Sequence, residues 1–487
     1  MNYLDLTVAE IHSALVEKKV TALELVKTCI DRIKNDKNNS YEATNFDEAL
    51  KLASSIDDVQ PEEFFKGIPY VAKDNYSTKD IETTASSNIL QGYVPTFDAE
   101  VINKLKKAGA ILVAKTTLDE LAMGGTGLSG HKGPTSNPYD DTRIIGGSSC
   151  GSCAAVAKCD APFALGSDTG DSVRKPAGYG GLVGMKPTWG RISRFGLFPF
   201  APSLDTIAYF TRSVKDSAML TNLLVGHDDK DMSTSLHKTE DFSEYLKKDN
   251  EKKNIGYFKS VIDAVKDQTI VNHFYHMIEL LKKQGYVVKN YEFPSDLLNA
   301  LYPVYMVISC SEATSNDANL DGIKFGIKPS GKAKTWEEYM MEARTKGFSP
   351  LIKRRFVIGS FSLLAENQEE LFRRAQKARR LIVDQMDKFF ETNDYLLLPV
   401  AKSVAPLIKD SSDRWNPNPN FVDNHLGIAN LGGYPSLSLP LGYEDKLPFG
   451  INITGRQFEE GHVFALGQDI ENITGLKNTS TLKRGIK

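Results

Sequence analysis

The chain has 487 residues, of which 41% are hydrophobic and 25% are charged, the usual balance of a globular protein. Its formal net charge of −3 gives no indication of nucleic-acid binding by this chain alone. The sequence contains no run of about 18 apolar residues, so we expect no membrane span. The early residues lack the apolar core of a signal peptide, and the five cysteines do not suggest a disulfide framework. We therefore expect a cytoplasmic protein with reduced thiols.

Two amphipathic helices are expected near the start of the chain. The segments Thr7–Glu10 and Thr21–Glu24 both fit the capping box, in which a threonine and a glutamate three residues later bond reciprocally to the backbone of the first helical turn. After the second box, apolar residues recur at helical spacing at Leu23, Val26, Ile30 and Ile33. We interpret both helices as structural.

From about residue 67 to residue 210, short apolar runs alternate with helix-like segments. "GIPYVAK" and "AILVAK" are typical of buried strands, and "AEVINKLKKAG" predicts a helix that ends at Gly109. After a polar stretch from about 228 to 249, "NIGYF", "YVVKN", "YLLLPV" and "PSLSLPLG" predict further strands. A long helix is expected from Gln368 to Phe390, with Asn367 as its N-cap. This alternation predicts an α/β fold.

The cysteines in "GGSSCGSCAAVAKC" raise the question of a metal or redox site. Cys150 and Cys153 form a CxxC, but only Cys159 lies near, and a zinc site needs four ligands in a recognisable spacing. A phosphate loop is also disfavoured, because neither GxxxxGK[ST] nor GxGxxG is present. We expect these cysteines to be small buried apolar residues.

A serine nucleophile is a second interpretation of the same region. Ser172 lies in "GDSV" rather than in the GxSxG of a nucleophile elbow, and no histidine is close in sequence, although triad members can be far apart along a chain. Lys73, at the end of a predicted buried strand, can act as a base if burial lowers its pKa. A lysine at that position is by itself more typical of a surface charge.

The combination of these stretches resembles the amidase-signature family of hydrolases. The resemblance extends through "GIPYVAKDN", "GGSSCGSCAA", "LGSDTGDSVRKPA" and "GLVGMKPTWGRISRFG", and Ser172 lies 172 − 148 = 24 residues after Ser148, as the family signature requires. It implies a Ser-cisSer-Lys triad with Lys73 as the base, Ser148 as the bridging serine after a cis peptide bond and Ser172 as the nucleophile. It also implies an oxyanion hole made by the backbone N–H groups of Thr169, Gly170, Asp171 and Ser172.

For the fold, the resemblance implies a large mixed β-sheet with helices on both faces. We expect one domain over residues 1–487. Its catalytic core would occupy about 60–215 and 395–465, and a more helical region beside the substrate would occupy about 230–395.

Within the family, "GRISRFGLFPFAPSLD", "SEATSNDANLDGIKFG" and "GFSPLIKRRFVIGSF" are most similar to A subunits of glutamyl-tRNA(Gln)/aspartyl-tRNA(Asn) amidotransferases. Such subunits hydrolyse glutamine and supply ammonia to transamidate Glu-tRNA(Gln) or Asp-tRNA(Asn). The resemblance implies that Arg355 binds the α-carboxylate of glutamine, that Asp423 binds its α-ammonium group and that Tyr305 lines the site. It implies no cofactor or metal in this chain. ATP, Mg²⁺ and tRNA would bind a partner B subunit, and a small C subunit would wrap the two.

Two other functions are compatible with the sequence. A stand-alone amidase of the same family would act on another small amide without partners. A non-catalytic scaffold would keep the fold but not the reaction. Intact Lys73, Ser148 and Ser172 argue against the scaffold.

The chain departs from the family pattern beside the expected nucleophile. Asp171 stands where the family usually has glycine, and Lys175 stands where glutamine is frequent. A carboxylate facing a developing oxyanion would be unfavourable. Because the two unusual charges occur together, we expect Asp171 to turn away from the oxyanion hole and to pair with Arg174 or Lys175. The alternative is that Asp171 disables the site.

Overall fold

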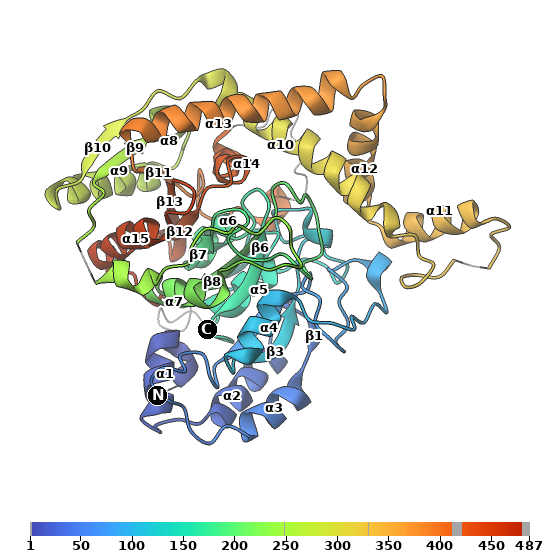
Figure 1. Cartoon of the computed structure of the whole chain (residues 1–487), viewed down its shortest axis with the longest axis horizontal. Coiled ribbons are helices and arrows are strands. Elements are labelled where there is room, and N and C mark those ends of the chain that lie inside the picture. The colour runs from blue at the N-terminus through green and yellow to red at the C-terminus, as the bar shows by residue number, and fades with distance from the viewer. Residues whose placement is uncertain (1, 248, 330, 412–420, 480–487) are drawn as a thin grey trace.

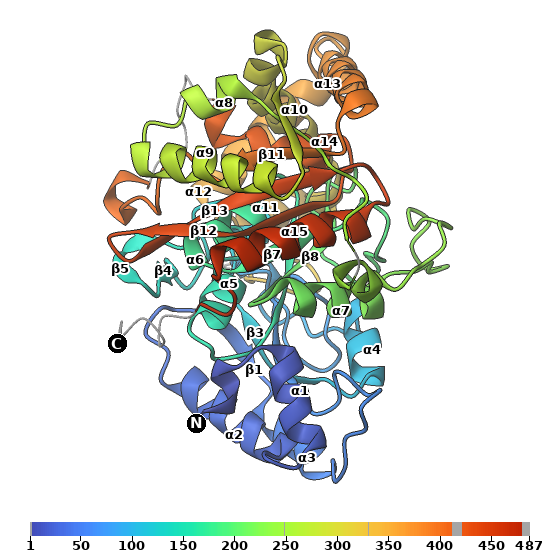
Figure 2. The ribbon, with the colours of Figure 1, turned by 90° about the vertical axis from the view of Figure 1, so that its left-hand side faces the viewer.

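The computed structural model describes residues 2–247, 249–329, 331–411 and 421–479. Across these residues a single eleven-stranded mixed sheet runs through the molecule, as the sequence predicted (Figures 1 and 2). A separate pair of short strands, β4 (Ser136–Asn137) and β5 (Asp140–Ile144), lies outside it. In spatial order the large sheet consists of β1 (Tyr41–Thr44), β3 (Ile111–Thr116), β2 (Pro69–Lys73), β6 (Ala164–Asp168), β8 (Thr206–Thr211), β7 (Val183–Lys186), β12 (Ser436–Glu444), β13 (Leu447–Gly455), β11 (Tyr395–Pro399), β9 (Asn254–Tyr257) and β10 (Val287–Asn290).

The central strands are buried on both faces. Every residue of β2, β3, β6, β8, β7, β11 and β13 is buried. Side chains alternate between the two faces of a strand, so continuous burial requires that both faces be covered. Helices α5 and α15 supply part of this cover: α5 contacts β2 and β6, and α15 lies along β12 and β13 (Figure 2).

Fifteen α-helices surround the sheet in the described part of the chain. They are α1 (Val8–Val16), α2 (Ala22–Lys34), α3 (Phe46–Ser54), α4 (Glu100–Lys107), α5 (Cys150–Ala157), α6 (Arg174–Gly180), α7 (Val214–Leu224), α8 (Lys259–Asp263), α9 (Gln268–Lys283), α10 (Ser295–Asn316), α11 (Trp336–Gly347), α12 (Pro350–Leu363), α13 (Arg374–Thr392), α14 (Ile428–Leu431) and α15 (Glu460–Thr474). No helix of these residues is both long enough and apolar enough to cross a membrane.

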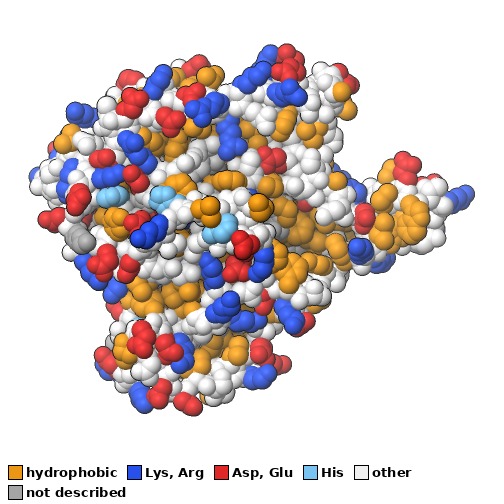
Figure 3. Space-filling model, in the orientation of Figure 1, with side chains coloured by type: hydrophobic (Ala, Val, Ile, Leu, Met, Phe, Trp, Pro, Cys, Tyr) orange, Lys and Arg blue, Asp and Glu red, His pale blue; other side chains and the backbone are white. Residues whose placement is uncertain are grey.

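In its described residues, the segment between β10 and β11 contains the helices α10 to α13 and no strand. Helix α10 packs against both α12 and α13, and α11 projects from the body of the molecule at the right of Figure 1. On the face drawn in Figure 3, side chains of both charges are interspersed, and apolar side chains show on the arm that carries α11. Trp336, at the start of α11, is 70% exposed.

The helix starts predicted near the N-terminus are confirmed, but the predicted start of α13 is wrong. Both capping boxes are present, with Thr7 paired to Glu10 and Thr21 paired to Glu24. The helix expected from Gln368 begins as a π-helical turn over Glu369–Arg373, and the α-helix covers Arg374–Thr392. Asn367 is not its cap, because the Asn367 side chain donates to the Phe361 carbonyl at 3.0 Å.

Candidate active site

Two neighbouring parallel strands bring the first site residues together. β2 pairs in parallel with β6, so their carboxyl ends lie at the same edge of the sheet. Lys73 is the last residue of β2, and the loop from Thr169 to Val173 follows β6 and leads into α6. The topology therefore places Lys73 beside the serine loop, although about a hundred residues separate the two in sequence.

Lys73 is fully buried and its amine contacts two serines. Nζ lies 2.8 Å from Ser148 Oγ and 2.9 Å from Ser167 Oγ, and Asn75 also donates to Ser167 Oγ at 3.0 Å. Burial lowers the pKa of Lys73 from 10.5 to about 8, because an ammonium ion loses its hydration there. A substantial fraction of the amine is therefore neutral near physiological pH, as a general base requires.

Ser148 lies at the turn that precedes α5. The peptide bond between Gly147 and Ser148 is cis, as the resemblance implied. A Cβ on Gly147 would lie 2.0 Å from Asp119 Oδ2, so the close approach of these two segments requires glycine. The next residue, Ser149, donates its N–H to the Ser172 carbonyl at 3.2 Å, and this bond joins the two serine loops.

Ser172 is 97% buried and lies in a loop held by an ion pair behind it. Arg174 Nη2 lies 2.9 Å from Asp168 Oδ1 and donates to the Gly170 carbonyl at 2.8 Å. Asn430 also contacts both charged partners: its Oδ1 accepts from Arg174 at 2.6 Å, and its Nδ2 donates to Asp168 at 3.0 Å. The loop is thus fixed from the side away from the pocket.

The backbone N–H groups of this loop are available to a ligand. Among the described residues, none of the hydrogen bonds formed uses the N–H groups of residues 169–172. Thr169 donates its hydroxyl to Asp205 Oδ1 at 2.7 Å, and Asp205 Oδ2 accepts the N–H groups of Phe200 and Ala201. Asp205 therefore fixes the start of the loop while leaving its N–H groups free.

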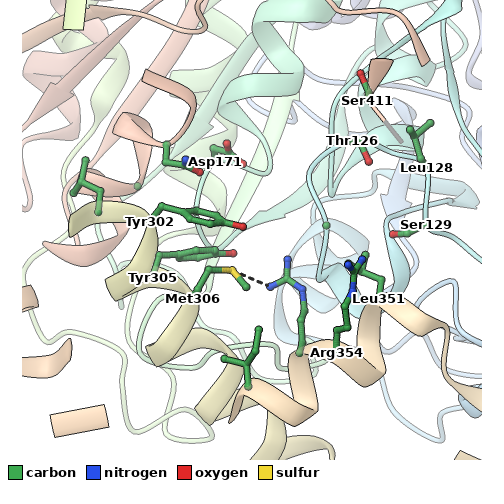
Figure 4. Close-up of a pocket in the computed structure, with 17 residues that line it drawn as sticks. Thr126, Leu128, Ser129, Asp171, Tyr302, Tyr305, Met306, Leu351, Arg354 and Ser411 are labelled. Carbon is green, nitrogen blue, oxygen red and sulfur yellow. Dashed lines mark hydrogen bonds between the residues drawn. The ribbon is translucent and has the colours of Figure 1, made fainter. Parts of the chain in front are cut away.

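A pocket opens directly above this loop (Figure 4). Gly170 and Asp171 form part of its wall, and the ring of Tyr305 on α10 packs on Gly170, where a Cβ would lie 3.1 Å from the ring. Across the pocket, α12 contributes Arg354 and Arg355. The complete lining comprises Gly124, Thr126, Leu128, Ser129, Gly170, Asp171, Leu301, Tyr302, Tyr305, Met306, Leu351, Arg354, Arg355, Ile358, Ser411, Asn424 and Gly427.

Arg355 is buried without a carboxylate partner. It is 93% buried, and none of the ion pairs among the described residues involves it. Its Nη1 lies 3.9 Å from the Met306 sulfur, the contact drawn as a dashed line in Figure 4, and its Nε has no hydrogen-bond partner. A buried unpaired guanidinium is costly, so an anion entering the pocket would be stabilised there.

Asp423 does not take the place that the resemblance implied. Its side chain does not line the pocket, and its Oδ2 pairs with Lys402 at 2.8 Å in a partly exposed position. The adjacent Asn424 lines the pocket instead.

The two unusual charges beside Ser172 form an ion pair. Asp171 Oδ2 pairs with Lys175 Nζ, one helical turn further along the chain, as the paired substitutions predicted. Of the two partners considered, Arg174 is engaged with Asp168. Both residues of the Asp171–Lys175 pair are more than 90% buried, so this pair is a fixed part of the site.

The cysteines are buried thiols. Cys150, Cys153 and Cys159 are free, and burial raises the pKa of Cys150 to about 12, so its thiol stays protonated. Within the described ranges no group of three or more His, Cys, Asp or Glu side chains is placed to hold a metal ion. The Cys150 thiol donates to the Thr117 carbonyl at 3.6 Å and the Cys153 thiol to the Pro176 carbonyl at 3.1 Å, and all three cysteines are buried, as small apolar residues are.

Sequence reasoning missed the residues that support the site. The Asp119 carboxylate accepts four successive backbone N–H groups, from Thr126 to Ser129, at 3.0–3.1 Å, and the Asp119 N–H donates to the Ser148 carbonyl. It therefore holds one pocket wall against the Ser148 turn. Behind Lys73, Asp74 forms a fully buried ion pair with Lys115 at 2.8 Å. The charged residues at the ends of "GIPYVAKD" and "AILVAK" were the available signal.

Comparison with known proteins agrees with this architecture. The model of the Amidase family matches residues 24–464. The A subunit of the glutamyl-tRNA(Gln) amidotransferase of Pediococcus pentosaceus is 37% identical over 97% of this chain and 98% of its own length, and that of Lactiplantibacillus plantarum is 36% identical over 97% of each chain.

Solved structures show the same fold over nearly the whole chain. The crystal structure of the A subunit of the glutamyl-tRNA(Gln) amidotransferase from Thermotoga maritima superposes with a TM-score of 0.79 at 32% identity, covering 97% of this chain and 95% of that one. The peptide amidase of Stenotrophomonas maltophilia superposes with a TM-score of 0.81 at 25% identity, covering 97% and 98%. The chain described here belongs to the amidase family.

Proposed function

We propose that this chain is the glutaminase subunit of a tRNA-dependent amidotransferase, in which it hydrolyses glutamine and supplies ammonia for the transamidation of Glu-tRNA(Gln) or Asp-tRNA(Asn). Similarity to amidotransferase A subunits over 97% of the chain supports this assignment. The observation that carries it is the buried Lys73–Ser148 contact. A bond from the Ser149 N–H to the Ser172 carbonyl joins it to the loop whose residues Gly170 and Asp171 line the pocket of Arg355.

In the proposed reaction Ser172 is the nucleophile and Lys73 is the base. Neutral Lys73 accepts the Ser148 hydroxyl proton while Ser148 accepts that of Ser172, whose Oγ forms a bond to the side-chain carbonyl carbon of glutamine. The pKa of about 8 for Lys73 favours this transfer because the amine is neutral in a useful fraction of molecules and its conjugate acid can return the proton.

The free N–H groups of residues 169–172 would stabilise the oxyanion of the tetrahedral intermediate. The intermediate then collapses: the C–N bond breaks, the proton held by Lys73 returns through Ser148 to the nitrogen, and ammonia leaves. A water molecule, activated by the same two residues, attacks the resulting ester and releases glutamate and Ser172.

Arg355 would bind the α-carboxylate of glutamine. Among the described residues its Nε has no hydrogen-bond partner, and its guanidinium contacts the sulfur of Met306 and the ring of Phe200. Two parallel N–H donors match a carboxylate. Tyr305 would form the wall between this carboxylate and the Gly170 end of the pocket.

The proposed partners follow from this assignment. A B subunit would bind ATP, Mg²⁺ and the misacylated tRNA and would receive the ammonia, and a small C subunit would join the other two chains. The chain itself would need no cofactor, since the reaction uses only side chains and backbone groups described above.

The test is glutamine hydrolysis by the chain co-expressed with B and C subunits, with and without ATP and misacylated tRNA. We expect the wild-type complex to hydrolyse glutamine and the Ser172→Ala variant to do so at least about 10³-fold more slowly. Ser167→Ala is the matched control, because the buried Ser167 hydroxyl contacts the same lysine, and its rate should fall far less. Hydrolysis of unrelated amides without any dependence on partners would favour a stand-alone amidase. No hydrolysis under any condition would favour the non-catalytic scaffold.

A further inference from the structure

The pocket contains charges of both signs at separate positions. Asp171 is the one carboxylate among the described lining residues, and Arg354 and Arg355 are the cations. In the view of Figure 4, Tyr302 and Tyr305 lie between Asp171 and the guanidinium that reaches toward Met306. Free amino acids carry one carboxylate and one ammonium group, so a pocket for such a substrate needs one site for each.

The Asp171–Lys175 ion pair presents its negative end to the pocket. Asp171 lines the pocket, whereas Lys175 does not and lies behind it on α6. Lys175 pairs with Asp171 Oδ2, and among the described residues no hydrogen bond to Oδ1 is formed. The lysine therefore engages one carboxylate oxygen and leaves the other for a donor from the pocket.

The residue expected to bind an ammonium group is turned elsewhere. The Asp423 carboxylate pairs with Lys402, while Lys175 Nζ donates to the Asp423 backbone carbonyl at 2.7 Å. Lys175 thus connects the Asp171 carboxylate to the backbone of Asp423, whose neighbour Asn424 lines the pocket. Among the described lining residues, Asp171 is the one that offers a negative charge.

We infer that Asp171 is the ammonium-binding residue of this pocket and that Lys175 is its positioning residue. The inference rests on the proposed function, because the bound α-ammonium group would be that of glutamine. Arg355 would then bind the α-carboxylate of glutamine and Asp171 its α-ammonium group. The side-chain amide would extend to Ser172, the neighbour of Asp171. The bound ammonium would also compensate the carboxylate charge beside the oxyanion.

The experiment compares glutamine with glutaramate, which has the same carboxylate and amide but lacks the α-ammonium group. Asp171→Asn and the matched control Asp423→Asn are assayed in the complete complex. We expect Asp171→Asn to lower kcat/KM for glutamine about tenfold or more and to change that for glutaramate less than about threefold, because only glutamine loses a charge-assisted hydrogen bond. Asp423→Asn should change neither value more than about threefold.

Three outcomes would overturn the inference. A glutamine-selective loss in Asp423→Asn but not in Asp171→Asn would assign the ammonium to Asp423. Equal losses on both substrates, in Asp171→Asn and in Asp171→Gly, would show that Asp171 acts on the reacting groups. Unchanged kcat/KM values for both substrates in both Asp171 variants would show that it acts on neither. A wild-type complex that hydrolyses neither substrate would instead refute the proposed function.

Discussion

Replacing Lys73 by methionine should stabilise the protein at neutral pH while abolishing its activity. Lys73 is fully buried, and its pKa falls from 10.5 to about 8 because of that burial. Each pKa unit corresponds to about 1.36 kcal/mol, so keeping the amine protonated in the folded state costs about 3 kcal/mol below pH 8. Losing its hydrogen bonds to Ser148 and Ser167 offsets about 2 kcal/mol. The expected net gain for Lys73→Met at pH 7 is about 1 kcal/mol.

The pH dependence is a sharper test than the net gain. Between pH 8 and 10.5 the unfolded chain holds the Lys73 proton and the folded protein does not, so the wild-type free energy of unfolding rises with pH in this window relative to that of the variant. From pH 7 to pH 9.5 the advantage of Lys73→Met should fall by about 2 kcal/mol and change sign. Urea unfolding of both proteins at these pH values measures the difference.

Lys115→Met is the matched control. Lys115 is equally buried, but it is paired with Asp74, so its removal leaves an unpaired buried carboxylate and should destabilise the protein by about 3–5 kcal/mol. A free-energy difference between wild type and Lys73→Met that stays constant from pH 7 to 9.5 would refute the reasoning, because it would mean that Lys73 keeps its proton in the folded state.

Three further predictions follow from the site. kcat/KM for glutamine should rise nearly tenfold per pH unit below pH 7, bend near pH 8 and level off above it, as Lys73 becomes neutral; a flat profile from pH 6 to 8 would contradict its role as base. Arg355→Lys should raise KM for glutamine at least about tenfold with a smaller effect on kcat, because a lysine cannot bind the carboxylate through two parallel hydrogen bonds. An unchanged KM in steady-state assays would exclude carboxylate binding by Arg355. Cys150→Gly with Cys153→Ala should keep activity within about threefold, and a loss with retained Tm would point to a thiol role.

Short-range signals predicted part of the fold. The strands expected from "GIPYVAK", "AILVAK", "NIGYF", "YVVKN", "YLLLPV" and "PSLSLPLG" are all present, because a short apolar run is itself a strand signal. The predicted start of α13 was wrong, because the π-turn over Glu369–Arg373 has no sequence signal that separates it from an α-helix. The order of strands in the sheet could not be read from the runs themselves.

For the site, sequence separation decided what could be predicted. The Asp171–Lys175 pair was predicted because its members are one helical turn apart and both depart from the family pattern. The turn of Asp423 toward Lys402 and the Asp119 carboxylate under residues 126–129 depend on how loops meet in space, which one sequence does not specify. The catalytic roles of Lys73, Ser148 and Ser172 remain predictions from the resemblance, supported by their placement.

The contact of Asn430 with Arg174 and Asp168 has a consequence for biosynthesis. The loop that carries Ser172 is held in part by Asn430 and by the Leu426 carbonyl, both of which lie more than 250 residues further along the chain. A growing polypeptide thus reaches its reactive geometry only after these late residues have emerged from the ribosome and folded back. We therefore expect that nascent chains and products of premature termination do not hydrolyse glutamine, so unassembled fragments would not deplete the glutamine of the cell.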